Sequence, residues 1–421
     1  MMRRPALFRT LALAAVALVA LGACTSKKSA AKNPKAEPLK LRVGLLFTTS
    51  GEGGDLAQAV LGATKLASDD ANVGGGRKVS IEFVQADYAG DPKQVPKAID
   101  SLKGKTDAIV VGTPDPIVLP GLGAISDVPI IQTLIGNDDV TKRANVFSLA
   151  PTDSLIAEKM TDYLVNVRKY KRIVVLTDNT TFGKTGKEAV ENALRDLGVE
   201  PKLSLTFTPG GDIHTPVAHA GQVNADAVIT WVFSPSEAAR IVVETQKMSF
   251  AYQIALSGNL ATSTFAKNAS AQVTPVAFRD GLLSVGPWAG PWFNLGRIIN
   301  FYARFQTENS AQAPVQAAAF YDSVAIIAKA ARNTGSTAGQ DLVGGLEKIT
   351  DFEGAGVPVS FGAGDHSGID IDDLGMYGFT KDQDSAGGHY FPDVDTGGGF
   401  FTIVTESLAL PSKYKFLTTK V

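Results

Sequence analysis

The sequence predicts an α/β fold built in two successive halves, and three observations support this prediction. From residue 41 onward, short apolar runs that end in Gly, Ser or Thr alternate with helical stretches. This order is typical of parallel βαβ units whose sheets are covered on both faces. The same cycle restarts near residue 155, and a chain of 421 residues is long enough for two domains.

The first half is expected to contain four strands with helices between them. The strands are short runs rich in Leu, Ile and Val, at 41–47, 79–85, 108–112 and 128–133. The helices that separate them are predicted at about 55–72, 92–102 and 119–126.

The second half repeats the pattern. We expect helices at 155–170, 187–197 and 237–248, and strands at 172–177, 201–207, 227–232 and 253–256. Thr152 and Asp153 are the predicted crossing between the halves. Further helices are predicted at 294–306, 315–333 and 342–349. The tail from Phe352 is rich in Gly, Asp and aromatic residues, and its β-like runs 357–361 and 400–404 predict a terminal hairpin or ribbon.

The amino-terminal segment has the pattern of a secretory signal. Arginines at the start are followed by an apolar run at 11–21 and by Leu-Gly-Ala before Cys24, the only cysteine. The run is too short for a membrane span. This ending resembles the lipobox of bacterial lipoproteins, which implies cleavage before Cys24 and a lipid anchor on it. We therefore predict a signal peptide at 1–23, a flexible Lys- and Ala-rich tether at 24–40, and an extracytoplasmic protein anchored to the cell membrane.

Composition excludes several function classes. A formal net charge of -2 gives no electrostatic basis for nucleic-acid binding. With Cys24 reserved for lipid, the folded part has no disulfide and no thiolate metal site. The segment Gly183-Lys-Thr resembles the end of a phosphate-binding loop, but Asp178 occupies the position that needs glycine. The four histidines match no zinc pattern. We expect no metal, no cofactor and no enzymatic activity.

Several motifs, in order along the chain, resemble one protein family. The clearest is Asp87-Tyr-Ala-Gly-Asp-Pro-Lys-Gln, which resembles the segment after the second strand of the leucine/isoleucine/valine-binding proteins of branched-chain amino-acid ABC transporters. The other matching segments are 42–45, 50–51, 108–112, 178–183, 234–237, 359–361 and 364–368. The resemblance implies two Rossmann-like lobes with parallel central sheets, joined by a three-crossover hinge, as in type I periplasmic binding proteins. Lobe one would be 41–150 plus 280–348, and lobe two 151–279 plus 349–421.

The resemblance also assigns candidate ligand-binding residues in the first lobe. Ser50 is either part of the cleft rim or a helix-capping hydroxyl, and Leu56 stands where amino-acid binders often have an aromatic. Thr113 can donate to a ligand carboxylate, whereas the prolines beside it have no N–H. Asp115 is either a ligand contact unfavourable to a carboxylate or a solvated turn residue. The family's frequent disulfide would fall near Gly90 and Asp115, where both cysteines are absent.

The remaining candidates follow later strands. Gly136 and Asn137 stand closest to the family's small residues and threonine, and Asn137 could instead cap a helix. Phe182 and Phe233 either form a cleft wall or pack in the hinge or core. Asn259 falls where amino-acid binders place the acid that pairs with the α-ammonium group.

The function implied is capture of a small organic ligand and delivery to an ABC importer. The missing acid argues against an ordinary α-amino acid held in the usual way, so a branched, aromatic or carboxylic ligand is favoured. The expected partners are the ligand, the permease subunits of the transporter and the membrane, with the protein a monomer. A ligand sensor that signals to a membrane partner without transport would have the same domain physics and stays an alternative.

Trp288 and Trp292 lie at the predicted crossover back to the first lobe, and packing of the linker is their favoured role.

Overall fold

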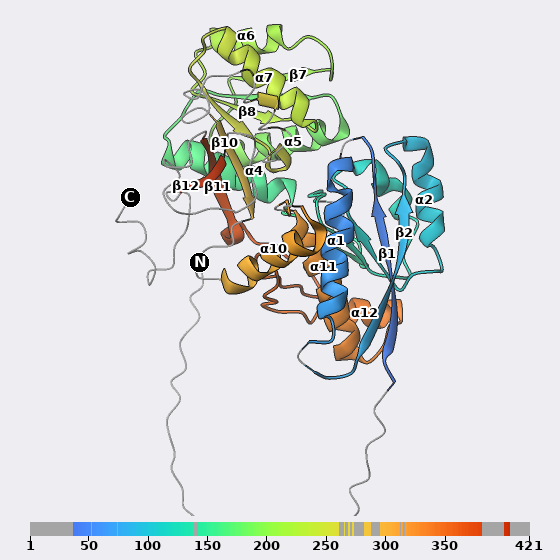
Figure 1. Ribbon diagram of the computed structural model, residues 1–421. Coiled ribbons are helices and arrows are strands. Elements are labelled where there is room, and N and C mark those ends of the chain that lie inside the picture. Colours follow the sequence, from blue (N-terminus) through green and yellow to red (C-terminus); the bar gives the residue numbers. More distant parts are fainter. Residues whose placement is uncertain are drawn as a thin grey trace, which may run out of the picture. The chain divides into compact units, whose positions relative to one another are not determined.

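The structure is a computed structural model in which two β-sheets are flanked by helices (Figure 1). It describes residues 37–51, 53–73, 75–138, 142–260, 265, 268–269, 272, 282–287, 295–311, 313–314, 316–380 and 400–404. Both sheets are mostly parallel and have helices on both faces, which confirms the predicted α/β class. The predicted signal peptide, Cys24, Trp288 and Trp292 lie outside the described residues.

The first sheet has five parallel strands in the order β2-β1-β3-β4-β5. Their bounds are β1 Leu39–Phe47, β2 Val79–Asp87, β3 Ala108–Val111, β4 Ile130–Gln132 and β5 Val146–Ser148. Four of these strands were predicted, and β5 was not. Three residues give too short an apolar run to be recognised, and this strand forms because β4 offers it an open edge.

Helices cover both faces of the first sheet because alternate strand residues point to opposite sides. Side chains of β1 such as Val43 pack against one group of helices, and Leu46 packs against the other. The first group comes from both ends of the domain: α1 Ala57–Asp70, α10 Leu295–Asn309, α11 Ala317–Thr334 and α12 Gly339–Leu346. The second group is α2 Val95–Leu102 and α3 Leu119–Leu122.

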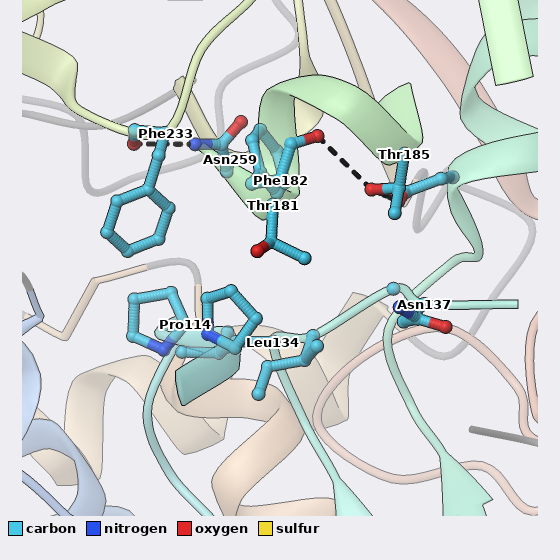
Figure 2. Close-up of a pocket in the computed structure, with 12 residues that line it drawn as sticks. Pro114, Leu134, Asn137, Thr181, Phe182, Thr185, Phe233 and Asn259 are labelled. Carbon is cyan, nitrogen blue, oxygen red and sulfur yellow. Dashed lines mark hydrogen bonds between the residues drawn. The ribbon is translucent and has the colours of Figure 1, made fainter. Parts of the chain in front are cut away.

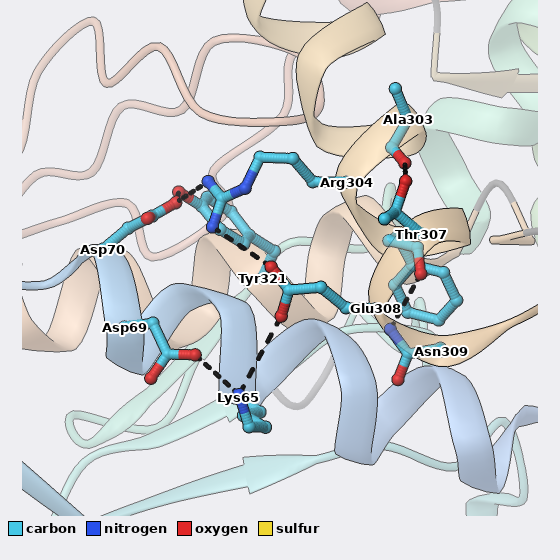
Figure 3. Close-up of polar contacts among 10 residues, drawn as sticks. Lys65, Asp69, Asp70, Ala303, Arg304, Thr307, Glu308, Asn309 and Tyr321 are labelled. Atoms are coloured by element: carbon cyan, nitrogen blue, oxygen red, sulfur yellow. Dashed lines mark hydrogen bonds and ion pairs between the residues drawn. The ribbon is translucent and has the colours of Figure 1, made fainter.

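A polar cluster joins α1 to α10 and α11 (Figure 3). The Asp70 carboxylate accepts from the Arg304 guanidinium at 2.7 Å and from the Tyr321 hydroxyl at 2.8 Å. Burial, and then the hydrogen bond to Asp70, raise the pKa of Tyr321. Lys65 pairs with Asp69 at 2.7 Å and reaches Glu308 of α10 at 3.9 Å. These contacts bind the late helices to the first sheet.

The second sheet has the order β12-β11-β10-β9-β8-β6-β7. Strand β11 pairs antiparallel with both of its neighbours, β10 and β12. Its strands are β6 Ile173–Asp178, β7 Leu203–Phe207, β8 Ala227–Trp231, β9 Gln253–Leu256, β10 Leu282–Pro287, β11 Leu374–Thr380 and β12 Phe400–Val404. The pairing of β11 with β12 confirms a terminal antiparallel ribbon. The predicted run 357–361 is not a strand, because it makes only an isolated bridge between Phe352 and Val359.

Helices again cover both faces: α4 Asp153–Asp162, continued by a π-helical turn at Tyr163–Val167, and α5 Thr181–Asp196 pack on one face. The other face carries α6 His214–Gln222, which was not predicted, and α7 Pro235–Lys247. Helix α5 begins six residues before the predicted start, because the Thr180 hydroxyl accepts from the Gly183 N–H and caps the helix. The motif segment 178–183 therefore includes the start of α5.

The chain returns beside β5 at residues 366–368. The Ser148 N–H donates to the His366 carbonyl at 2.9 Å, and the Gly368 N–H donates to the Ser148 carbonyl at 2.8 Å. The buried His366 ring stacks on Phe147 with centroids 4.0 Å apart. Residues 282–287, placed in lobe one by the prediction, pair as β10 with β9 in the second sheet. The other lobe boundaries stay a prediction.

No helix among the described residues has the length and apolar character needed to cross a bilayer.

Candidate functional site

A pocket lies where loops from both sheets meet, and it contains about 400 Å³ of empty space that includes open solvent. Figure 2 shows Phe233 and Thr181 facing Pro114 and Leu134 across it. The described residues that line it are Pro114, Pro116, Leu134, Ile135, Gly136, Asn137, Asp153, Thr181, Phe182, Thr185, Phe233 and Asn259.

Nearly every lining segment follows the carboxyl end of a strand. Pro114 and Pro116 follow β3, and residues 134–137 follow β4. On the other side, residues 181–185 follow β6, and Phe233 and Asn259 follow β8 and β9. Ligands of parallel α/β sheets bind at these ends, because loops and helix N-termini converge there. The position of the pocket therefore follows from the fold.

Two phenylalanines form the apolar wall on the side of the second sheet. Phe182 stands in the first turn of α5, and its ring packs edge-on against Phe233 with centroids 5.9 Å apart. It also lies 6.1 Å from the buried ring of Trp231 on β8. Both predicted phenylalanines thus line the pocket, and Phe182 contacts the core as well.

Asn259 holds the loop that carries Phe233. Its side-chain amide donates to the carbonyls of Val232 and Phe233 at 3.2 and 3.0 Å, and its oxygen accepts from the Ser257 hydroxyl at 2.7 Å. Asn259 therefore lines the pocket and fixes its wall (Figure 2).

Gly136 brings the loop after β4 against the chain that crosses to the second sheet. The Asp153 N–H donates to the Gly136 carbonyl at 2.6 Å. A β-carbon at residue 136 would lie 2.1 Å from the Pro151 carbonyl oxygen, so no larger residue fits without movement of backbone. Asn137, beside it, also lines the pocket.

Asp153 is a lining residue that sequence reasoning treated only as a crossing point. It is 5% exposed, and burial raises its pKa to about 7, with Asp138 adding to the rise. The Thr185 hydroxyl donates to it at 3.1 Å. Asp153 directly follows the capping residue Thr152 in the first turn of α4, and acidic residues are common at such positions. Its burial depends on loops distant in sequence, so no local signal marks it.

The other four predicted residues do not line the pocket. The Ser50 hydroxyl donates to the Ala89 carbonyl at 2.6 Å, and Leu56 packs against the first core. Thr113 is buried and shares a 2.8 Å hydrogen bond with the Tyr88 hydroxyl. Asp115 accepts from the Ile117 N–H at 3.0 Å and caps the turn 116–118, and burial raises its pKa.

These hydrogen bonds and contacts within the protein explain why the four side chains do not line the pocket. The hydroxyl of Thr113 and the carboxylate of Asp115 serve the loop that presents the neighbouring prolines to the pocket. The Ser50 hydroxyl holds its loop against residue 89 by a hydrogen bond, without a disulfide. The two loops are so close at residue 90 that a β-carbon there would lie 2.6 Å from the Ser50 carbonyl oxygen.

A second hollow lies on the first domain alone, between α3 and α12. Its lining includes residues 143–145, which precede β5, so it is at the amino-terminal edge of the sheet. The Arg143 side chain there donates to three backbone carbonyls, of Leu122, Gly123 and Ile125. Within the described residues, no group of three His, Cys, Asp or Glu could hold a metal ion.

Comparison with known proteins gives partial matches in sequence. An amino acid binding protein of Pseudomonas aeruginosa is 30% identical over 155 residues, which cover 35% of this chain and 41% of the relative. A Leu/Ile/Val-binding protein homologue of Brucella melitensis is 28% identical over 178 residues, covering 40% and 48%. The chain thus spans less than half the length of these relatives.

Matches among solved structures are longer. A type 1 periplasmic binding protein from Bordetella pertussis superimposes with a TM-score of 0.70 at 20% identity, covering 82% of this chain and 98% of that one. A branched-chain amino acid transporter substrate-binding protein from Streptococcus pneumoniae, solved with isoleucine, gives a TM-score of 0.68 at 20% identity, covering 87% and 99%. A family model described as periplasmic binding protein matches residues 40–373. The chain therefore belongs to the periplasmic binding protein family and has its type I fold.

Proposed function

We propose that this protein captures a small organic ligand in the pocket between its two sheets and delivers it to an ABC importer. The ligand is amino-acid-like, branched, aromatic or carboxylic. The observation that carries the proposal is the lining itself: loops after β3 and β4 face loops after β6, β8 and β9 around one pocket. A lipid on Cys24 anchors the protein beside its transporter.

The relatives support the ligand class. The Pseudomonas aeruginosa relative is named an amino acid binding protein, and the Streptococcus pneumoniae structure was solved with isoleucine. Membership of a solute-binding family also supports binding rather than catalysis.

The pocket suits binding coupled to lobe movement. Aromatic and aliphatic side chains from both sheets would enclose an apolar ligand, and burial of each methylene contributes about 0.8 kcal/mol. Because such contacts come from both sides at once, the ligand would favour the conformation in which the lobes enclose it.

The test is a thermal-shift screen of the full chain, purified in detergent, against amino acids, aromatic acids, amides and sugars. A ligand that binds the folded state raises the melting temperature by linkage, and at 100 times its Kd the stabilisation is about 2.7 kcal/mol. If no small molecule raises the melting temperature, the proposed function is wrong.

Replacing both wall residues, Phe182→Ala with Phe233→Ala, is expected to weaken binding of an identified ligand by roughly 10- to 100-fold. Both rings line the pocket, and loss of a central aromatic contact typically weakens binding by about 1–2 kcal/mol. Isothermal titration calorimetry measures the change. Unchanged affinity would place the ligand elsewhere. Phe250→Ala is the control, because Phe250 packs in the second core, outside the pocket lining.

Replacing Cys24→Ser is expected to release the protein from the membrane while leaving the affinity for its ligand unchanged. Serine has no thiol to carry the lipid, and residue 24 lies far along the chain from the first lining residue, Pro114. Membrane fractionation and a binding assay on the released protein measure the two effects. Anchoring that persists in the variant would contradict the lipobox.

A further inference from the structure

We propose that Asp178 is the positioning residue of the apolar wall formed by Phe182 and Phe233. Its carboxylate fixes the two loops that carry these rings, and in this way it sets a preference of the pocket for ligands with a bulky apolar part. Asp178 is not among the described lining residues, so it acts through the two rings. The ligand preference rests on the proposed binding function.

The place of Asp178 follows from the order of the strands in the second sheet. Strand β6 pairs with β8, and Thr177 lies opposite Trp231 in their register. Asp178 is the last residue of β6, so it stands beside the loop that leaves β8 and carries Phe233. The chain after β6 leads into α5, whose first turn carries Phe182. Asp178 therefore lies where both loops of the wall begin.

Each oxygen of the Asp178 carboxylate binds one of these loops. The residue is 1% exposed. Oδ1 accepts from the Thr180 N–H at 3.0 Å and also from the Thr180 hydroxyl. Oδ2 accepts from the Phe233 N–H at 2.7 Å. Because all of these partners are donors, the position suits a carboxylate, which only accepts. A single buried side chain thus links the loop after β6 to the loop after β8.

On the side of α5, Thr180 carries the effect of Asp178 to Phe182. The hydroxyl that donates to Asp178 also accepts from the Gly183 N–H at 3.1 Å and caps the helix. A β-carbon at residue 183 would lie 2.1 Å from the Asp178 carbonyl oxygen, so the helix begins in close contact with the end of β6. Phe182 lies between these two held residues, so its main chain has little freedom to move.

On the side of β8, both the N–H and the carbonyl of Phe233 are held by side chains. The N–H donates to Asp178, and the carbonyl accepts from the Asn259 amide at 3.0 Å (Figure 2). The two rings of the wall then meet edge-on at 5.9 Å, and Phe182 lies 6.1 Å from the ring of Trp231. A wall that is already in place binds a matching ligand at a lower entropic cost.

Replacing Asp178→Asn should loosen this wall. An amide has one accepting oxygen and one donating NH₂ group, so one of the two loops would face a donor where it now has an acceptor. Asp322→Asn is the matched control. Asp322 is 2% exposed, and its oxygens also accept from two backbone N–H groups, outside the pocket lining. Both variants should lose stability, whereas only Asp178→Asn should change the wall.

The state of the wall can be measured without a ligand. The full chain, in detergent, is labelled with 5-fluorotryptophan at its three tryptophans, and the fluorine NMR resonance of Trp231 is assigned with Trp231→Phe. The ring current of Phe182 acts on this resonance, because the two rings lie 6.1 Å apart. Asp178→Asn should therefore shift or broaden the Trp231 resonance, and Asp322→Asn should leave it unchanged.

A double-mutant cycle separates movement of Phe182 from a direct effect of the substitution on Trp231. In a Phe182→Leu background the ring is absent, so Asp178→Asn should then produce little further shift. If Asp178→Asn does not fold, Thr180 tests the same link from the other partner. Thr180→Val removes the hydroxyl and should shift the resonance, whereas Thr180→Ser keeps the hydroxyl and should not.

The ligand preference is measured by calorimetry with two matched pairs of probes, phenylalanine against alanine and 4-methylpentanoate against acetate. We expect the larger member of at least one pair to bind the unmodified protein about 10-fold or more tightly, and Asp178→Asn to reduce that ratio by roughly 5-fold or more. The ratio of two dissociation constants does not depend on the folded fraction, so a loss of stability alone leaves it unchanged. Asp322→Asn should therefore keep the ratio.

The outcomes separate the two proposals. A Trp231 resonance that Asp178→Asn leaves unchanged, or a shift that persists in full in the Phe182→Leu background, would overturn the role of Asp178 in the wall. Probes that bind without preference for the larger member, a ratio that Asp178→Asn keeps, or one that Asp322→Asn lowers equally would overturn its role in ligand preference. If no probe binds and the wider thermal-shift screen also fails, the binding function is wrong, while the fluorine resonances still decide whether Asp178 holds the wall.

Discussion

Substitution of Gly136→Ala is expected to lower the free energy of unfolding by roughly 2–4 kcal/mol and to remove measurable ligand binding. The added β-carbon would lie 2.1 Å from the Pro151 carbonyl oxygen, which is backbone and cannot rotate away. The loop after β4 must then separate from the crossing segment. That movement breaks the 2.6 Å hydrogen bond from the Asp153 N–H and shifts two lining residues at once.

Urea unfolding followed by circular dichroism measures the stability, and calorimetry measures the affinity for a ligand found in the screen. Gly344→Ala is the matched control, because Gly344 lies in α12 and no described atom beyond its chain neighbours and its own helix backbone lies within 4 Å of the added β-carbon. Alanine has the higher helix propensity, so this variant should gain up to about 1 kcal/mol. A Gly136→Ala protein as stable as the unmodified one would show that the loop is not held as described.

Substitution of Asp322→Ala is expected to lower the free energy of unfolding by roughly 3–5 kcal/mol. Asp322 lies in α11 and is 2% exposed. Its two oxygens accept from the Ala355 N–H at 2.6 Å and the Gly356 N–H at 2.9 Å. Alanine would leave both donors without a partner and open a cavity. Urea unfolding measures the loss, and the exposed Asp341→Ala in α12 should change stability by less than about 0.5 kcal/mol.

The pH dependence of the free energy of unfolding gives a second test of the role of Asp322. Burial raises the pKa of Asp322 from 3.8 to about 7, so the folded state binds more protons than the unfolded state between those values. The contribution of this group to stability is therefore greatest below pH 4 and falls as pH rises to 7. The advantage of Asp322 over an Asp322→Asn variant should shrink between pH 5 and pH 8; an advantage that grows would contradict the assignment.

Much of the fold could be predicted because alternation of apolar runs and helical stretches is a local signal. The strands β1, β3 and β9 lie within a few residues of the predicted ranges. The errors arise where tertiary contacts decide. Strand β5 is three residues long and needs the edge of β4, and β10 and β11 became strands because they extend the second sheet.

The candidate site shows the same distinction between residues placed by a local signal and residues placed by tertiary contacts. Gly136, Asn137, Phe182, Phe233 and Asn259 line the pocket because they follow the carboxyl ends of strands, and that position can be inferred from topology. Thr113 and Asp115 have the right place in the sequence, but their side chains bind within their own loops. Asp153 was predicted only as a crossing residue and not as a lining residue, because its burial is created by loops brought together only in the folded chain.

The contact between α1 and α11 has a consequence for synthesis. Helix α1 ends at Asp70, and its partners on the same face of the sheet begin only at Leu295 and Ala317. A growing chain therefore completes β1 to β5 and most of the second domain while α1 still lacks α10 and α11, the helices that pack against it. Contacts between such distant segments form slowly, and exposed apolar surface promotes aggregation. The first domain can finish folding only after residues near 346 have emerged, so the domain that starts first is completed late.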